Sequence, residues 1–228
     1  MYTLAIIPAR SGSKGIKNKN IKKINNHTLI EKAYKTAKDS KIFTKIIVST
    51  DSLHYKNILE KKGIKIFSLR SKKHSRDHST DLDVLKHEIK KYEKIFKIKF
   101  SVIALLQPTS PLRKVIDLKK CYNKLKKYKL NAVWTVSKVD KKFDPIKLLQ
   151  INKNNLRYYS KKGSKFTSRQ LLKQYFIRNG VAYFFTRKAI LKYNTILPKN
   201  CGYILIKRKL INIDNLAEFN EAKEILES

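Results

Sequence analysis

The chain has 228 residues, of which 42% are hydrophobic, and its 53 Lys and Arg against 17 Asp and Glu give a formal net charge of +36. This length and apolar content suffice for one large α/β domain with a buried core. No apolar run approaches the length of a membrane span, and the sequence starts with a strand-like segment instead of a signal peptide. We therefore expect a soluble cytoplasmic protein, in which Cys121 and Cys201 are ordinary thiols.

The charge alone favours nucleic acid or an acidic surface as a partner. However, only nine of the cations are arginine, and the 44 lysines are spread along the chain instead of being gathered in one tail. A dedicated nucleic-acid reader more often uses arginine, which makes bidentate base contacts and stacks on aromatic rings. Scattered lysine is typical of solvated faces, so a basic nucleic-acid-binding α/β domain stays the less favoured alternative.

Strand-like and helix-like segments alternate through the first 139 residues. The predicted strands cover residues 3–8, 45–49, 64–69, 100–106 and 131–139, and the predicted helices cover 29–38, 53–62, 83–96 and 115–128. Thr28, with Glu31 three residues later, predicts a capped start of the first helix, and Gly63 predicts the end of the second. This order predicts an α/β fold with a mostly parallel, doubly wound sheet.

The regular pattern fails between residues 140 and 179. This stretch is basic and loop-like, with aromatic residues at Tyr158, Tyr159 and Phe166, and regular structure is expected again from residue 180 to 186. It predicts an excursion from the sheet that covers the substrate or meets a second subunit, although a simple flexible loop is the alternative. A strand at 203–207 and an amphipathic helix at 216–226 complete a single domain over residues 1–228.

The loop after the first strand predicts an anion site. Small residues between 11 and 15 allow backbone N–H groups to approach a phosphate, and Arg10, Lys14 and Lys19 add positive charge. The spacing matches neither the Walker A loop nor the dinucleotide fingerprint. In an open α/β sheet, ligands collect at the carboxyl ends of strands, and this loop lies at such an end. The alternative is a basic surface turn.

Further polar residues follow the other strands, at the same predicted edge of the sheet. These are Ser49-Thr50-Asp51, Arg70, the segment Gln107-Pro108-Thr109-Ser110-Pro111-Leu112-Arg113, and Asn212-Ile213-Asp214. Asn212 and Asp214 stand two apart, so on an extended chain they could share one hard cation, although Asp214 could instead cap the helix that follows. His74, His78 and His87 have no zinc-ligand spacing and are predicted to be exposed or packed.

Four segments together resemble the acylneuraminate cytidylyltransferases, which make CMP-sialic acid and related CMP-nonulosonic acids. They are Ile6-Ile7-Pro8-Ala9-Arg10-Ser11-Gly12-Ser13-Lys14-Gly15-Ile16 with Lys19-Asn20, Val48-Ser49-Thr50-Asp51, Leu106-Gln107-Pro108-Thr109-Ser110-Pro111-Leu112-Arg113, and Arg178-Asn179-Gly180-Val181-Ala182-Tyr183. The resemblance runs in order from residue 4 to about residue 226. It implies a Rossmann-like nucleotidyltransferase fold and a reaction of CTP with a 2-keto sugar acid that releases pyrophosphate, with Mg²⁺ neutralising the leaving group.

The resemblance also implies roles for individual residues. Arg10, Ser13, Lys14 and Lys19 would hold the triphosphate, Asn20, Arg70, Ser79 and Asp81 the cytidine, Gln107, Thr109, Ser110 and Arg178 the sugar acid, and Asn212 and Asp214 the Mg²⁺, with Arg169 neutralising an anionic group near the reacting centre. A homodimer is implied as well. Related ketodeoxyoctonate cytidylyltransferases are a second possibility, but they lack the Ser-Lys-Gly and Lys-Asn pattern of the first loop.

The sequence departs from the family pattern at several of these positions. Lys17 stands where relatives commonly have proline, and Asn212 replaces the first Asp of a usual Asp-x-Asp. Ser168-Arg169-Gln170-Leu171-Leu172 resembles the family's Arg-Arg-Gln-Asp-Leu with two replacements, and Ile177 occupies a position that is often basic. A catalytically degenerate relative is therefore another alternative.

Overall fold

The computed structural model describes residues 1–165, 168, 170 and 172–227. The chain divides into two compact units. The first contains residues 1–135, 179–204 and those from 209 onward, and the second contains residues 136–178 and 205–208. Within the described chain, no helix combines the length and the apolar character that crossing a bilayer requires.

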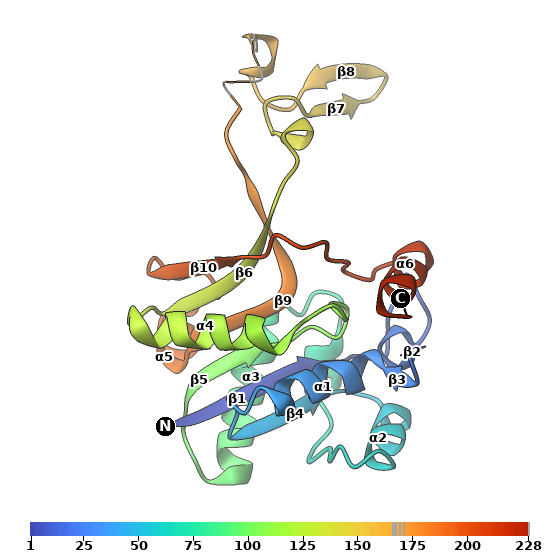
Figure 1. Cartoon of the computed structure of the whole chain (residues 1–228), viewed down its shortest axis with the longest axis vertical. Coiled ribbons are helices and arrows are strands. Elements are labelled where there is room, and N and C mark those ends of the chain that lie inside the picture. The colour runs from blue at the N-terminus through green and yellow to red at the C-terminus, as the bar shows by residue number, and fades with distance from the viewer. Residues whose placement is uncertain (166–167, 169, 171, 228) are drawn as a thin grey trace. The chain divides into compact units, whose positions relative to one another are not determined.

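A six-stranded sheet forms the centre of the fold, in the order β10-β6-β9-β5-β1-β4 (Figure 1). Its strands are β1 (Tyr2–Pro8), β4 (Lys45–Ser49), β5 (Phe100–Leu105), β6 (Ala132–Lys138), β9 (Phe176–Thr186) and β10 (Cys201–Leu205). β1 pairs in parallel with both β4 and β5, whereas β9 pairs antiparallel with β5. The sheet is mostly parallel, as the sequence predicts.

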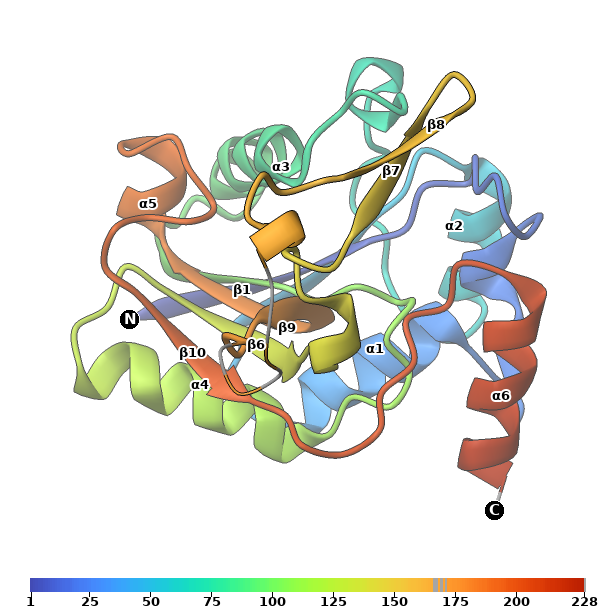
Figure 2. The same cartoon turned by 90° about the horizontal axis from the view of Figure 1, so that it is seen from above.

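Helices cover both faces of this sheet. They are α1 (Leu29–Asp39), α2 (Leu53–Glu60), α3 (Asp81–Phe96), α4 (Val115–Lys127), α5 (Arg187–Leu191) and α6 (Leu216–Glu227). Figure 2 shows α1 and α4 on one face of the sheet and α3 and α5 on the other. The predicted doubly wound α/β architecture is therefore confirmed.

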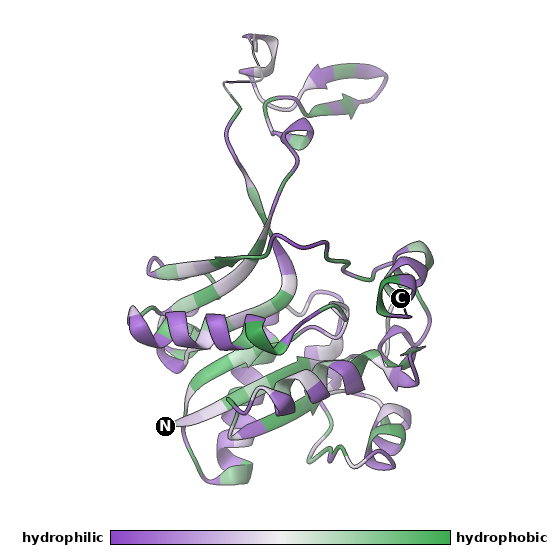
Figure 3. Cartoon of the chain, viewed as in Figure 1, coloured by the Kyte–Doolittle hydropathy of each residue, from purple (hydrophilic) through white to green (hydrophobic). Residues whose placement is uncertain are grey.

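β1 shows why its sequence predicts a central strand. Ala5 and Ile7 belong to the apolar cluster on one face, Leu4 and Ile6 to the cluster on the other, and all four are fully buried. A strand covered by helices on both sides has no polar face, so it appears as a continuous apolar run. Figure 3 shows this contrast between apolar strands and helices whose outer surfaces are hydrophilic.

The local signals at the helix ends are confirmed. The Thr28 hydroxyl accepts a hydrogen bond from the backbone N–H of Glu31, and the Glu31 carboxylate accepts one from the N–H of Thr28, forming a capping box at the start of α1. Gly63 has φ of 74° and lies in the turn that follows α2, three residues after Glu60. A residue with a side chain is strained in this left-handed conformation, so glycine suits the end of the helix.

The prediction of a strand at 64–69 is wrong. Ile64 and Ile66 are buried in the core, but in the part of the chain that the structure describes the segment pairs with no strand, and β4 is the edge of the sheet. Its backbone is held by other contacts: the N–H of Ile66 donates to the Glu60 carboxylate at 3.3 Å, and the N–H of Arg70 donates to Thr50 O at 2.7 Å. Burial of alternate residues therefore arises here without strand pairing.

The second unit contains a β-hairpin that the sequence pattern does not predict. Strands β7 (Leu149–Asn152) and β8 (Asn155–Tyr158) pair antiparallel, and between them Lys153 has φ of 52°. The expectation of a loop-like stretch over 140–179 is wrong for these residues, and also at its end, where β9 starts at Phe176 instead of 180. Phe166 lies outside the described residues.

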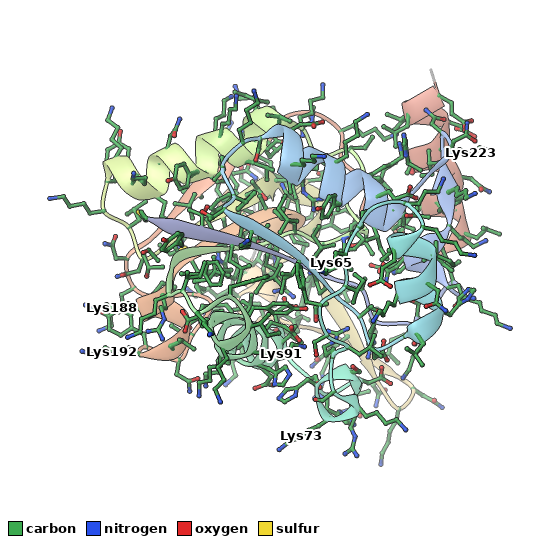
Figure 4. The ribbon with its side chains drawn as sticks, turned by 90° about the horizontal axis from the view of Figure 1, so that it is seen from below. Lys65, Lys73, Lys91, Lys188, Lys192 and Lys223 are labelled. Carbon is green, nitrogen blue, oxygen red and sulfur yellow. The ribbon has the colours of Figure 1, made fainter. Side chains whose placement is uncertain are left out.

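The lysines are distributed over many elements. Those labelled in Figure 4 belong to the segment after α2, to a 3-10 helix at Lys72–Ser75, to α3, to the α5 region and to α6, and they point in different directions. Long lysine side chains with solvated ends suit such positions. This arrangement agrees with the interpretation of the charge as a property of solvated faces.

Candidate active site

A cavity of about 510 Å³ lies in the first unit, where loops follow the carboxyl ends of β1 and β5. Loops that follow other strands and the segment before α6 complete its walls. Twelve of the residues predicted to form the site line it: Arg10, Ser13, Lys14, Lys19, Asn20, Arg70, Ser79, Asp81, Gln107, Thr109, Asn212 and Asp214. Sequence positions more than 200 residues apart therefore meet in one place.

The first loop places two cations on one carboxylate. Arg10 Nη1 lies 2.7 Å from Asp77 Oδ1, and Lys14 Nζ lies 2.7 Å from Asp77 Oδ2. The hydrogen bonds from Lys14 and Arg10 hold the pKa of Asp77 below its usual value, so this side chain is an anion at neutral pH. The loop therefore binds an anionic group of the protein itself at the position predicted for phosphate.

Lys19 connects the first loop to the segment before α6. Its Nζ donates to the backbone oxygen of Ile213 at 2.7 Å and to Asp214 Oδ1 at 2.9 Å, and its side chain is only 12% exposed. Gly15 allows the first loop to lie close to the segment before α6, because a Cβ at position 15 would lie 2.1 Å from the backbone oxygen of Asp214. Asn20 is buried and donates to the backbone oxygen of Arg10 at 3.0 Å, which fixes the path of the loop.

Asp51 supports the first loop through its contacts with Ser11. Its Oδ1 accepts a hydrogen bond from the backbone N–H of Ser11 at 2.9 Å, and its Oδ2 lies 3.4 Å from the Ser11 hydroxyl. A carboxylate that accepts a backbone N–H orders the turn that contains it. The Ser49-Thr50-Asp51 segment therefore shapes the loop, and Asp51 is not among the residues that line the cavity.

The contacts of the segment before α6 bear on the two roles that the sequence leaves open for Asp214, cation ligand and helix cap. The N–H of Glu218 donates to Asn215 Oδ1 at 2.9 Å, and Glu218 Oε2 accepts from the N–H of Asn215 at 3.1 Å, so Asn215 caps the helix. Asp214 instead directs its carboxylate toward Lys19. The interpretation of Asp214 as only a helix cap is therefore wrong.

The segment from Gln107 to Arg113 joins β9 to the segment before α6. The Thr109 hydroxyl donates to Asn212 Oδ1 at 2.7 Å, and the buried Ser110 hydroxyl donates to the backbone oxygen of Asn179 at 3.2 Å. Gly180 has φ of 74°, and a Cβ there would lie 2.3 Å from Ser110 Oγ and 2.8 Å from Gln107 Oε1. Glycine is needed at this position for both reasons.

Arg113 has a structural role in the same segment. Its guanidinium is buried and donates to the backbone oxygens of Gln107 at 2.7 Å and Gly180 at 3.2 Å, and also to that of Val181. Burial lowers its pKa to about 10, so it remains charged at neutral pH. The sequence places Arg113 among the polar residues at the end of β5, but it supports the cavity wall from behind.

Arg70 is the most buried cation of the cavity lining, with 5% of its surface exposed. Among the residues that the structure describes, none forms a hydrogen bond with its Nε or Nη2. Burial, together with the charge of Arg10, lowers the pKa of Arg70, whereas Asp51 and Glu88 act in the opposite direction. An unsatisfied buried donor costs about 1–3 kcal/mol. These donors are therefore suited to a ligand oxygen that enters the cavity.

Of the predicted residues that the structure describes, Ser110 and Arg178 do not line this cavity. Ser110 lies directly behind it and contacts Asn212 at 3.5 Å. Arg178 belongs to the second unit, and Arg169 lies outside the described residues. Leu171, the residue at the family's Asp position, lies outside them as well.

The cavity also contains residues to which the sequence assigns no site role. Asp77, Arg76 and His74 line it, together with Pro8, Val84 and Pro108, and so does Gly15 of the predicted anion loop. The His74 ring stacks on His87 at 4.1 Å between centroids, in agreement with the predicted packing role. The charged residues between 74 and 81 are a sequence signal for this part of the site, because the run leads into α3 and contains two of the predicted site residues, Ser79 and Asp81.

Metal binding here would depend on a small set of ligands. Among the described residues, no group of three or more His, Cys, Asp and Glu side chains could hold a metal ion. Asn212 Nδ2 donates a hydrogen bond to Asp214 Oδ2 at 3.2 Å, and Asn212 Oδ1 accepts one from the Thr109 hydroxyl, so one carboxylate and one amide lie together at the cavity, where the amide oxygen and not Nδ2 could bind a metal. Mg²⁺ is often bound by one or two carboxylates, substrate phosphates and water, so these two residues fit such an ion.

Comparison with known proteins agrees with the fold and assigns the family. The sequence profile of the family described as Cytidylyltransferase matches residues 4–227. The chain is 31% identical over 217 residues to CMP-N,N'-diacetyllegionaminic acid synthase from Campylobacter jejuni, covering 95% of this chain and 91% of that protein. It is 29% identical over 218 residues to post-translational flagellin modification protein B from Campylobacter coli, covering 95% and 91%.

Two further similarities extend this result. The N-acylneuraminate cytidylyltransferase of Escherichia coli O18:K1:H7 is 31% identical over 227 residues, which cover 96% of this chain and 51% of that protein. The solved structure of a CMP:2-keto-3-deoxy-manno-octonic acid synthetase complexed with CTP superposes with a TM-score of 0.73 at 16% identity, covering 100% of this chain and 99% of the other. This structural likeness shows a shared nucleotidyltransferase fold. The family profile and the related sequences show that the chain belongs to the cytidylyltransferase family.

Proposed function

We propose that this protein transfers CMP from CTP to the anomeric hydroxyl of a nonulosonic acid and releases pyrophosphate. The observation that carries this proposal is the convergence of Arg10, Lys14, Lys19 and Arg70 on one cavity at the carboxyl ends of the strands. The names of the related proteins support an acid of the sialic, legionaminic or pseudaminic type as the acceptor.

The proposed reaction needs positioning and positive charge from the protein. The acceptor hydroxyl oxygen forms a bond to the α-phosphorus of CTP, the bond from that phosphorus to the bridging oxygen of the β-phosphate breaks, and the hydroxyl proton is lost to solvent or a nearby base. Arg10, Lys14 and Lys19, with Ser13, would bind the triphosphate and stabilise the charge that develops on the leaving pyrophosphate.

The remaining residues of the cavity would hold the two substrates in line. Asn20, Arg70, Ser79 and Asp81 would bind the cytidine part, and Gln107 and Thr109, supported by Ser110, would contact the acid. Fixing both substrates converts a reaction between two molecules into one within a complex, which lowers the barrier substantially. Arg178 would contact the acid, and Arg169 would neutralise an anionic group near the reacting centre, as the sequence resemblance implies.

Mg²⁺ is part of this proposal, and Asp214 and Asn212 are the residues that would hold it. When bound, the ion would neutralise phosphate charge during departure of pyrophosphate. Asp214 Oδ1 contacts Lys19 Nζ, and Asp214 Oδ2 accepts a hydrogen bond from Asn212 Nδ2 that the ion would replace, so Oδ2 could serve the ion while Oδ1 stays with Lys19. Substrate phosphates and water would complete the coordination.

Replacing Asp214 by Asn tests the metal proposal. We expect the Mg²⁺ concentration for half-maximal rate to rise by about 10-fold or more, because an anionic ligand becomes neutral. The measurement is a Mg²⁺ titration of the rate at saturating CTP. An unchanged Mg²⁺ curve with a raised KM for CTP would mean that Asp214 acts only as the partner of Lys19.

Pyrophosphate release tests the proposed function directly. The purified chain is incubated with CTP and Mg²⁺ and with one acid at a time, from N-acetylneuraminate, legionaminate, pseudaminate and ketodeoxyoctonate. Release that requires both CTP and one acid supports CMP transfer and identifies the acceptor class. If no acid gives release although CTP binds in a titration, catalysis of this reaction is excluded for the panel, and the degenerate alternative is favoured.

We further propose that the protein is a homodimer in which the second unit contacts its partner. The β7–β8 hairpin presents four apolar side chains on one face, because Leu149 pairs with Tyr158 and Ile151 pairs with Leu156. All four are exposed, and Ile151 is 77% exposed. An apolar strand face of this kind is typical of a protein interaction site.

Replacing Ile151 by Glu tests the dimer. A carboxylate in the centre of this face would be desolvated on association, so we expect the dimer to dissociate at least 100-fold more readily. Light scattering over a range of protein concentrations measures this. Gln150→Glu is the matched control, because Gln150 points to the opposite face of the hairpin. A wild-type chain that stays monomeric with full activity would contradict the proposal.

A further inference from the structure

We propose that Asp77 is a built-in competing anion of the phosphate site, whose carboxylate binds Arg10 and Lys14 until phosphate displaces it. The identity of the incoming ligand as CTP or pyrophosphate rests on the proposed function. The inference itself rests on the contacts of Asp77, which none of the sequence motifs assigns to a role.

The geometry of this carboxylate matches what the two cations would offer to a phosphate group. Each oxygen contacts a different cation at 2.7 Å, Oδ1 with Arg10 Nη1 and Oδ2 with Lys14 Nζ. A phosphate group likewise presents separate oxygens to neighbouring cations, and charge-assisted hydrogen bonds have this length. Asp77 and an incoming phosphate therefore compete for the same donors.

The surroundings of Asp77 allow it to leave. It lies between the 3-10 helix Lys72–Ser75 and the start of α3, outside any regular element, and its side chain is 43% exposed. Lys14 is 80% exposed. Ion pairs at such exposed positions contribute little free energy, so a polyphosphate with several charges can replace them.

Two other acidic residues nearby, Asp214 and Asp83, have different partners from Asp77. Asp214 contacts Lys19, and the side chain of Asp83 accepts hydrogen bonds at the N-terminus of α3 from the backbone N–H and the hydroxyl of Thr80. Asp77 bridges the two cations of the first loop. Return of its carboxylate to Arg10 and Lys14 would also assist the departure of pyrophosphate, because the cations regain a partner as the product leaves.

The experiment compares Asp77→Asn with the wild type in a calorimetric titration with inorganic pyrophosphate, at fixed salt and without CTP or acid. We expect the variant to bind pyrophosphate about 3- to 30-fold more tightly, since up to two exposed ion pairs no longer compete. Asp140→Asn is the matched control. It removes one negative charge from an exposed carboxylate paired with Lys142, in the second unit, and should leave the affinity within twofold of wild type.

A double variant tests whether the change in pyrophosphate affinity arises from the ion pairs of Asp77. In a Lys14→Met background, where one of the two ion pairs is already absent, Asp77→Asn should change the affinity less than it does in the wild type. Equal or weaker binding by Asp77→Asn, or no measurable binding by either protein, overturns the proposal, because Asp77 would then only order the loop or the cations would not form a phosphate site. Thermal unfolding confirms that each variant is folded.

The proposed function can fail independently of this inference. A wild-type chain that binds pyrophosphate but transfers no CMP contradicts the function and leaves the competition by Asp77 testable. Conversely, a chain that transfers CMP, with an Asp77→Asn variant of unchanged affinity for pyrophosphate, contradicts only the role of Asp77.

Discussion

Lys19→Met is expected to lower the rate of CMP transfer by about 100- to 1000-fold, which is the size of effect seen when one charged donor is removed from a developing anion. Methionine keeps most of the aliphatic side chain and removes the charge. The lost hydrogen bonds should cost no more than about 3 kcal/mol of the free energy of unfolding, because Ile213 is fully buried and its oxygen loses a donor, whereas the Asp214 carboxylate is exposed and can bind water. Pyrophosphate release and urea unfolding measure the two effects separately.

Lys17→Met is the matched control for this prediction. Lys17 lies in the same loop, is exposed and is not among the residues that line the cavity. The same loss of charge there should change the rate by less than about twofold, because exposed charges away from the ligand are screened. A similar loss of rate in both variants would show that the overall charge of the loop matters, and a loss of stability of several kcal/mol in Lys19→Met would indicate a structural role.

Arg113→Met is expected to lower the free energy of unfolding by about 3–5 kcal/mol, the largest effect on stability that we predict. The variant removes the buried guanidinium from the backbone oxygens of Gln107, Gly180 and Val181. Gln107 O keeps the N–H of Ser110 at 3.2 Å, whereas the other two oxygens lose this donor, and each unsatisfied acceptor costs about 1–3 kcal/mol. Urea denaturation monitored by circular dichroism measures this as a lower midpoint with an unchanged slope.

Two further variants test whether burial and the shape of the guanidinium explain the loss of stability in Arg113→Met. Arg187→Met removes another guanidinium, which makes two hydrogen bonds with Glu93 at 2.8 and 3.0 Å but is 39% exposed, and should cost less than about 1 kcal/mol. Arg113→Lys should recover only part of the stability, because an ammonium group lacks the planar fork that reaches three acceptors. Equal losses at positions 113 and 187 would contradict the role of burial.

The candidate site was predictable where the sequence contains both a local signal and a position in the sheet. A loop rich in small residues and cations after an apolar strand is one such signal, and the expected edge of a parallel sheet then brings Arg10, Gln107 and Asp214 together. The resemblance to a family added the roles of individual side chains. Asp77 was missed because its importance depends on its partners, and no spacing within its own segment indicates that it reaches Arg10 and Lys14.

Arg113 shows the same limit for a residue in a recognisable motif. The sequence places it next to polar residues at the end of β5, which suggests a ligand contact. In the structure its guanidinium is buried behind the cavity, and its acceptors include Gly180 and Val181, nearly 70 residues away. Whether an arginine faces a ligand or the protein interior depends on which backbone carbonyls surround it, and those come from distant segments.

The sequence by itself determined the α/β class, most strands and helices, and the capping of α1, because these depend on apolar periodicity and on hydrogen bonds between residues three or four apart. Only the tertiary structure decided that 64–69 is not a strand and that 149–158 forms a hairpin, since strand formation requires a partner for each backbone N–H and C=O. It also decided which charged side chains meet. Ion pairs such as Lys19–Asp214 join residues 195 positions apart, and the path of the chain between them fixes that contact.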